Sequence, residues 1–222
     1  MDFVEEAKEY ESFSDKIKVI TSEIKNIVLE SKSEMEGNSF YDDNTLTRNY
    51  RQNAKQINLF ALGKNADSNI CEIGFNAGHS TILMLIGREK APLNYTIFDI
   101  GRHSYTLPCL NYLQLQFQHV NFEYIEGDST LTMQKWLETN TDKIGMYDLI
   151  HVDGGHTEEC IQSDMKNANL MIKAGGIIIV DDTYATQINN CVEQYLAKGT
   201  YKEIKGLDTQ FFSHRILQKV VL

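Results

Sequence analysis

The segment from Asn69 to Ser80, Asn-Ile-Cys-Glu-Ile-Gly-Phe-Asn-Ala-Gly-His-Ser, constrains the fold more than any other part of the chain. A short apolar run ends in an acid and is followed by Gly74, Asn76 and Gly78, and then by a new apolar segment. This order is typical of a strand, a tight turn and the start of a helix. Glycines in such a turn let the backbone approach a ligand, and the free N–H groups of the helix start can bind an acceptor.

The spacing of these glycines excludes two familiar nucleotide sites. Gly74 and Gly78 form a Gly-x-x-x-Gly pattern, which differs from the Gly-x-Gly-x-x-Gly of dinucleotide-binding proteins and the Gly-x-x-x-x-Gly-Lys of P-loops. The turn also contains no lysine that could hold a triphosphate. A purely structural turn in another α/β domain is the alternative interpretation.

From residue 69 onward, short apolar runs alternate with helical patterns. We expect strands at 69–73, 95–100, 121–125, 147–152 and 176–181, and helices near 79–89, 104–118, 130–139, 158–172 and 185–198. Residues 173–176 predict a helix stop, and residues 201–205 and 210–221 predict an antiparallel hairpin. Short buried strands alternating with helices indicate an α/β fold. We therefore expect a Rossmann-like, doubly wound, seven-stranded sheet that is mostly parallel and closed by the hairpin.

Residues 1–63 predict a helical N-terminal extension to an α/β domain at 64–222. Apolar residues recur at three- and four-residue steps across 1–36, which favours a helix that packs its stripe on the main domain. A dimerisation helix, giving a homodimer, or part of a lid over the substrate is the second interpretation. Another helix is expected from Thr45 to a stop at Gly63.

The second N-terminal helix carries the densest basic cluster of the chain. Arg48, Arg51 and Lys55 share one face, which we expect to be solvated, although the face could attract an anionic substrate. Tyr41 and Tyr50 are candidates for aromatic walls of a substrate pocket, from their location alone.

Composition and charge limit the classes of partner. The net charge is −10, from 21 basic and 31 acidic residues, which argues against nonspecific nucleic-acid binding. Four scattered cysteines without a Cys-x-x-Cys pair do not form a disulfide scaffold. The N-terminus resembles no signal peptide and the apolar runs are shorter than a membrane span, so we expect a cytoplasmic protein without membrane association.

Acidic and polar residues follow the first three expected strands, where doubly wound sheets bind ligands. Glu72 ends the first strand beside the glycine turn, and Asp99 ends the second, 25 residues after Gly74. An acid at that offset can accept hydrogen bonds from both hydroxyls of a ribose. Asp128 and Ser129 follow the third strand and could contact an adenine edge. The alternative for each acid is a helix N-cap or turn residue.

Three more carboxylates follow the fourth and fifth strands. Asp153 lies in His-Val-Asp-Gly-Gly-His, and Asp181 and Asp182 lie in Val-Asp-Asp-Thr. Crowded carboxylates repel one another, and a divalent cation relieves that repulsion; oxygen ligands favour Mg²⁺ or Ca²⁺, with Mn²⁺ possible. His156 suits a general base or acid, or a hydrogen-bonding partner of Asp153. The alternative for the carboxylates is helix capping without a metal.

These motifs together resemble the class I S-adenosylmethionine (SAM)-dependent methyltransferases over residues 69–183. The pattern Val-Asp-Gly-Gly-His followed by Gly-Gly-Ile-Ile-Ile-Val-Asp-Asp-Thr is similar to the metal-dependent O-methyltransferases of small molecules, including catechol-type and macrolide or sugar enzymes.

The resemblance implies a role for each candidate residue. Glu72, Gly74 and Gly78 would form the cofactor loop, lined by Asn76 and Ser80. Asp99 would hold the ribose of the cofactor, and Asp128 and Ser129 would contact its adenine. Mg²⁺ or another divalent cation would be bound by Asp153, Asp181 and Asp182. Many catechol-type members have Asp-Asn where this chain has Asp181-Asp182, and they place a lysine where this chain has His156.

The resemblance also implies a reaction, the metal-assisted transfer of a methyl group from SAM to a hydroxyl of a small molecule, for example a sugar or natural-product scaffold. Asp153 and His156 would be the catalytic residues, with His156 removing the hydroxyl proton. Three rivals are a metal-independent methyltransferase of the same fold, a noncatalytic SAM-fold binding or assembly protein, and a nucleic-acid methyltransferase, which the net charge disfavours.

Overall fold

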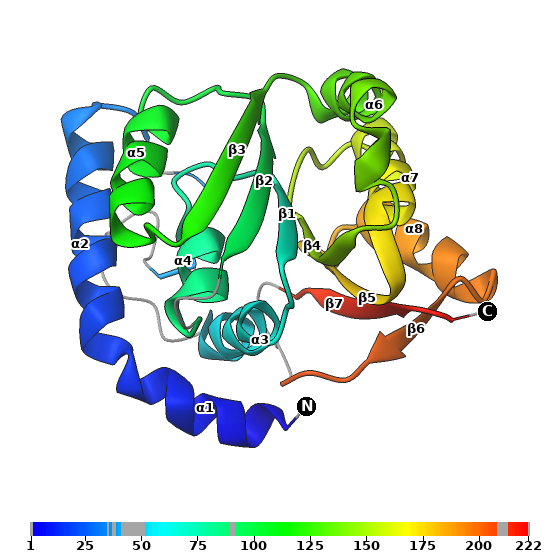
Figure 1. Cartoon of the computed structure of the whole chain (residues 1–222), viewed down its shortest axis with the longest axis horizontal. Coiled ribbons are helices and arrows are strands. Elements are labelled where there is room, and N and C mark those ends of the chain that lie inside the picture. Colours follow the sequence, from blue (N-terminus) through cyan, green and yellow to red (C-terminus); the bar gives the residue numbers. More distant parts are fainter. Residues whose placement is uncertain are drawn as a thin grey trace.

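One seven-stranded sheet organises the chain, in the order β3-β2-β1-β4-β5-β7-β6 (Figure 1). Its strands are β1 (Asn69–Ile73), β2 (Leu93–Asp99), β3 (Val120–Glu126), β4 (Tyr147–Val152), β5 (Ile172–Val180), β6 (Tyr201–Ile204) and β7 (Arg215–Lys219). The first five pair in parallel, and β7 runs antiparallel to both β5 and β6. The predicted doubly wound sheet with its antiparallel hairpin is thereby confirmed. The order reverses at β1, so the carboxyl ends of β1, β2 and β4 meet at the position where such sheets bind ligands.

The computed structural model describes residues 2–34, 36, 39–40, 52–88, 92–207 and 213–221. Arg48, Arg51, Tyr41 and Tyr50, which the sequence singled out, lie outside these described residues. No helix within them has the length and apolar character needed to cross a bilayer.

Helices cover both faces of the sheet (Figure 1). On one face lie α1 (Phe3–Ser12), α2 (Ser14–Glu30), α3 (Asn53–Lys64), α4 (His79–Ile86) and α5 (Thr106–Gln116), and on the other lie α6 (Ser129–Thr139), α7 (Glu158–Met171) and α8 (Thr186–Ala197). Each face has its own hydrophobic cluster. The first cluster contains residues of α1, α2 and α3 together with residues of α4, α5 and β2, so the N-terminal helices are part of the core. A lid function for this region stays a prediction.

The first helix is interrupted where the sequence predicted a continuous one. The N–H of Phe13 bonds to the carbonyl of Tyr10 instead of one a full turn back, and α2 starts at the next residue. The ring of Phe13 packs on Phe60 of α3 at 5.7 Å between centroids. On either side of the break, α1 packs against α3 and α2 packs against α5.

Helix α3 differs most from its prediction. The expected solvated face is wrong for Lys55, which is only 8% exposed. Gly63 does not stop the helix but lies inside it, where a Cβ atom would come 2.3 Å from the backbone of Met84 in α4. Gly63 therefore permits a close approach of the two helices, and α3 is buried along most of its length.

The helix stop predicted at residues 173–176 is also corrected. Helix α7 ends at Met171, and these residues belong to β5, whose register against β4 shifts between Tyr147 and Leu149. Gly176 faces the side chain of Ile172, and a Cβ atom there would lie 2.9 Å from it. The glycines thus serve an irregular strand.

Candidate functional site

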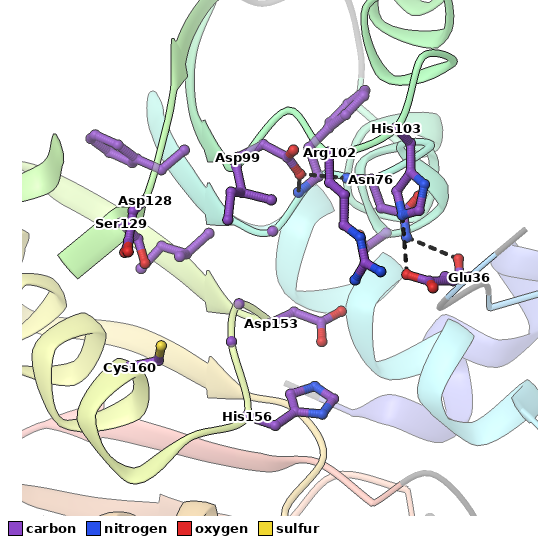
Figure 2. Close-up of a pocket in the computed structure, with 18 of the residues that line it drawn as sticks. Glu36, Asn76, Asp99, Arg102, His103, Asp128, Ser129, Asp153, His156 and Cys160 are labelled. Carbon is purple, nitrogen blue, oxygen red and sulfur yellow. Dashed lines mark hydrogen bonds and ion pairs between the residues drawn. The ribbon is translucent and has the colours of Figure 1, made fainter. Parts of the chain in front are cut away.

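A cavity of about 560 Å³ opens at the carboxyl ends of β1 to β4 (Figure 2). This size is typical of small-molecule sites. Most of the residues predicted from sequence line it: Gly74, Asn76, Ser80, Asp99, Asp128, Ser129, Asp153, His156 and Asp182. Glu72, Gly78 and Asp181 do not line it, and Glu72 and Asp181 are buried in the protein.

The glycine turn is shaped by contact with the end of β4. Gly74 has φ +90°, and a Cβ atom on it would lie 2.0 Å from the carbonyl oxygen of Asp153. Gly78, the N-cap of α4, has φ +79°, and its Cβ would lie 2.5 Å from the side chain of Leu113. Both the left-handed backbone and the lack of space require glycine here. Asn76, between them, also has a positive φ of 54°.

Asp99 stands at the predicted place, and its carboxylate organises the turn. One oxygen accepts hydrogen bonds from the N–H groups of Phe75 and Asn76, each at 2.8 Å, and the other from Gly101 at 2.7 Å. The carboxylate also lines the cavity. Asp99 therefore fixes the turn, whatever else it binds.

Glu72 lies inside the protein and anchors the turn from below. Its carboxylate accepts hydrogen bonds from Ser80 and Thr81 of α4 and, at 2.8 Å, from the hydroxyl of Tyr95. His151 Nδ1 lies 3.2 Å from the same carboxylate. These contacts join β1, β2, β4 and α4 beneath the cavity.

His151 is buried between two carboxylates, Glu72 at 3.2 Å and Asp181 at 3.7 Å. Burial alone would lower its pKa, but the hydrogen bonds and charges of these carboxylates outweigh burial and raise the pKa to about 10. Because the folded pKa exceeds the ordinary value of 6.5, the stabilisation is complete below pH 6.5 and is lost as the pH rises towards 10.

We therefore expect the free energy of unfolding to fall between pH 6.5 and 10 by more than about 1 kcal/mol through this group. Urea unfolding of the protein and of His151→Gln across this range measures the effect. The variant should show a shallower slope against pH, since glutamine does not titrate. Equal slopes would contradict a charged His151.

Asp128 has both of the roles that the sequence offered as alternatives, a helix cap and a residue of the ligand cavity. It is the N-cap of α6, where its carboxylate accepts a hydrogen bond from the N–H of Thr130 at 2.9 Å, and it also lines the cavity beside Ser129 (Figure 2). Capping and ligand contact are therefore compatible at this residue.

The three carboxylates after β4 and β5 come together as predicted, and we call Asp153, Asp181 and Asp182 the acid cluster. Two groups have potential ligand atoms within 4.8 Å of one another: His151 with Asp153 and Asp181, and His156 with Asp153 and Asp182. Burial, together with the charge of Asp181, raises the pKa of Asp153 well above its ordinary value. Asp182 adopts φ 52°, an uncommon backbone for a residue other than glycine.

His156 lies at the mouth of the acid cluster. Its Nε2 is 2.8 Å from a carboxylate oxygen of Asp182, and this hydrogen bond raises the pKa of the imidazole above 6.5. The side chain is 55% exposed, so it can reach a ligand in the cavity.

Lys55 belongs to this site, although the sequence placed it on a basic face and did not indicate its pairing with an acid. Its ammonium group forms a buried ion pair with Asp181. Burial would lower the pKa of Lys55, but the charges of Asp181 and Asp153 outweigh it and hold the pKa above its ordinary value. The lysine stands beside apolar Ala54 and Ile57 in a helical pattern, and no local signal points to a partner next to β5.

The N-terminal region also reaches the cavity, because Glu36 is one of its lining residues. The sequence did not indicate which residue of that region would make this contact. The side-chain amide of Asn76 donates to the backbone carbonyl of Glu36 at 2.9 Å, and the Glu36 carboxylate lies 3.0 Å from His103 Nε2 (Figure 2). Arg102 lines the same wall. The glycine turn is therefore in contact with the region before α3.

Comparisons with known proteins identify the family and the fold of this chain. Residues 71–183 match the model of a family described as a methyltransferase domain. No curated protein matches the sequence significantly. Among solved structures, the TDP-rhamnose 3′-O-methyltransferase CalS11 of calicheamicin biosynthesis is similar with a TM-score of 0.62 and 16% identity over 77% of this chain and 80% of that one. An O-methyltransferase from Bacillus cereus in complex with S-adenosylhomocysteine is similar with a TM-score of 0.62 and 16% sequence identity. The similarity covers 90% of this chain and 91% of that one. At these identities the likeness shows the fold.

Proposed function

Because this chain belongs to the methyltransferase-domain family and is a SAM-dependent methyltransferase, we propose that it methylates a hydroxyl group of a small molecule with the help of a divalent cation. The observation that carries the proposal is the group Asp153, His156 and Asp182, which faces the same cavity as the glycine turn. CalS11 and the Bacillus cereus protein are both O-methyltransferases, which supports the choice of oxygen as acceptor.

For the cofactor, we propose a place along the glycine turn. SAM supplies an electrophilic methyl group on a sulfonium. Gly74, Asn76, Gly78 and Ser80 would surround its amino-acid part, Asp99 its ribose, and Asp128 with Ser129 its adenine, while Glu72 acts from below by holding α4 in place. The cavity, which these residues of the turn and strand ends line, has a size that fits such a ligand.

For the cation, Asp153 and Asp182 are the two carboxylates of the acid cluster that line the cavity, and they fit a hard divalent ion. Burial first, and then the negative charges of Asp181 and Asp182, raise the pKa of Asp153, and a bound cation would offset both effects. When bound, Mg²⁺ or a similar ion would lower the pKa of a hydroxyl and fix its position. Asp181, the third predicted ligand, is ion-paired with Lys55.

We assign the proton transfer to His156. Its imidazole is exposed at the cavity mouth and held by Asp182, so it can accept the proton of an acceptor hydroxyl. The rest of the reaction is an in-line displacement, which depends on alignment of the acceptor with the methyl group. The rigid turn and the acid cluster, joined where Gly74 touches Asp153, provide that alignment.

Calorimetric titration with S-adenosylhomocysteine, with Mg²⁺ and again with EDTA, is the first test, followed by methyl transfer to hydroxylated small molecules under both conditions. We expect binding in both titrations, because the cofactor residues are separate from Asp182, and roughly a hundredfold or greater loss of transfer in EDTA. Absence of binding in both would contradict the cofactor site.

Full transfer in EDTA would replace this proposal by the metal-independent alternative, in which the acid cluster has a structural role. Cofactor binding without transfer to any acceptor would favour a binding or assembly protein. Transfer to nucleic acid alone would favour the third rival, although the net charge of −10 argues against it.

A further inference from the structure

Lys55 lies beside the acid cluster but has no role in the proposed reaction. It projects from α3, in the N-terminal region, to the carboxyl end of β5 on the neighbouring sheet, and its side chain is 9% exposed. Lysines are almost never buried to this degree without a partner. Its partner is Asp181, whose side chain is fully buried.

Both oxygens of Asp181 are engaged inside the protein. Oδ1 accepts a hydrogen bond from the N–H of Asp182 at 2.9 Å. Oδ2 faces the ammonium group of Lys55 and lies 3.7 Å from His151 Nε2. Asp181 also does not line the cavity, whereas Asp153 and Asp182 do. The three carboxylates of the acid cluster are therefore not equivalent.

The charge of Lys55 adds a second difference between Asp181 and the other two carboxylates. A divalent cation on Oδ2 of Asp181 would lie next to a buried ammonium group, and the repulsion of like charges is strong where water is excluded. A cation held by Asp153 and Asp182 avoids that contact and keeps one face open to the cavity. The inner carboxylate thus has a buried ammonium group as its partner, whereas the outer Asp182 is paired with the half-exposed imidazole of His156.

We propose that Lys55 is a positioning residue that serves as the fixed counter-charge of Asp181 and thereby confines a divalent cation to Asp153 and Asp182. This inference rests on the proposed function for the existence of the cation site. It assigns Asp181 a structural role beside the site, in place of the ligand role expected from the sequence.

Mn²⁺ binding to the metal-free protein, followed by calorimetry and by electron paramagnetic resonance of the free ion, tests the inference. Lys55→Met should bind Mn²⁺ at least tenfold more tightly than the unaltered protein, because Asp181 becomes available. Lys55→Arg, which keeps the charge, should stay within about threefold of it. Lys64→Met, which removes another ion-paired lysine of α3, is the matched control and should change nothing. Unchanged or weaker binding by Lys55→Met overturns the inference.

A second pair of variants covers the case in which Lys55→Met does not fold. Asp181→Asn should keep the Mn²⁺ affinity within about threefold, and Asp182→Asn should weaken it at least tenfold. Equal losses in the two variants overturn the inference. If the unaltered protein binds no Mn²⁺ but Lys55→Met does, the counter-charge role of Lys55 is supported, while the cation in the proposed function is not.

Discussion

Replacing Asp153 by asparagine is expected to lower the rate of methyl transfer at least a hundredfold and to leave the affinity for S-adenosylhomocysteine within about threefold. The change removes a charge that the proposed cation requires. The backbone contacts persist, since the N–H of Asp153 donates to the carbonyl of Ile73 at 2.8 Å and the main chain of Asp153 lies against Gly74. Single-turnover transfer and calorimetric titration measure the two quantities.

Asp148→Asn is the matched control for the loss of a buried carboxylate. Asp148 lies near the start of β4, at the other end of the strand, where it accepts hydrogen bonds from the N–H groups of Ser68 and Asn69 at 2.7 Å each. It should lower thermal stability without a specific loss of transfer. If Asp153→Asn retains more than a tenth of the rate, the acid cluster is not catalytic.

Replacing Gly74 by alanine is expected to weaken S-adenosylhomocysteine binding more than a hundredfold and to lower the melting temperature. The new Cβ atom would lie 2.0 Å from the carbonyl oxygen of Asp153, which is backbone and has no rotamer to change. The turn must then move away from β4, and with it the residues proposed to surround the cofactor. Calorimetry and thermal unfolding measure the two effects.

Gly145→Ala is the control that distinguishes the steric clash of a new Cβ atom from the cost of a positive φ angle in alanine. Gly145 also has a positive φ of 68°, but nothing lies within 4 Å of the position that a Cβ atom would take, so only a conformational penalty of about 1–2 kcal/mol is expected. It should reduce stability and leave cofactor affinity unchanged. Near-normal binding by Gly74→Ala would show that the turn does not shape the cofactor site.

The strand ends of the sheet were predictable because their signals are local. Gly74 and Gly78 adopt the positive φ angles for which glycine is suited, and Asp99 and Asp153 follow short apolar runs that form buried strands. Parallel pairing then brings the carboxyl ends of these strands together without any further information. Most of the cavity lining follows from this rule.

The surroundings of Asp181 were not predictable in this way. Lys55 pairs with a residue far along the chain, and a lysine in an amphipathic helix ordinarily lies in solvent. His151 in β4 has the sequence context of an apolar strand, although it connects Glu72 to Asp181. Contacts of this kind depend on how α3 packs against the sheet, which hydrophobic periodicity does not specify.

The close packing of α3 against α4 means that the methyltransferase domain of this protein needs residues that precede the segment shared with its family. The segment shared with the methyltransferase family starts at residue 71, after α3 has ended. A protein shortened to that segment would keep every acidic residue of the acid cluster but lose the ammonium group that neutralises Asp181, and the face of α4 against Gly63 would be exposed to water. The catalytic half of this chain is therefore electrostatically incomplete without the helix that ends at Lys64, so shared sequence alone does not delimit the smallest active enzyme.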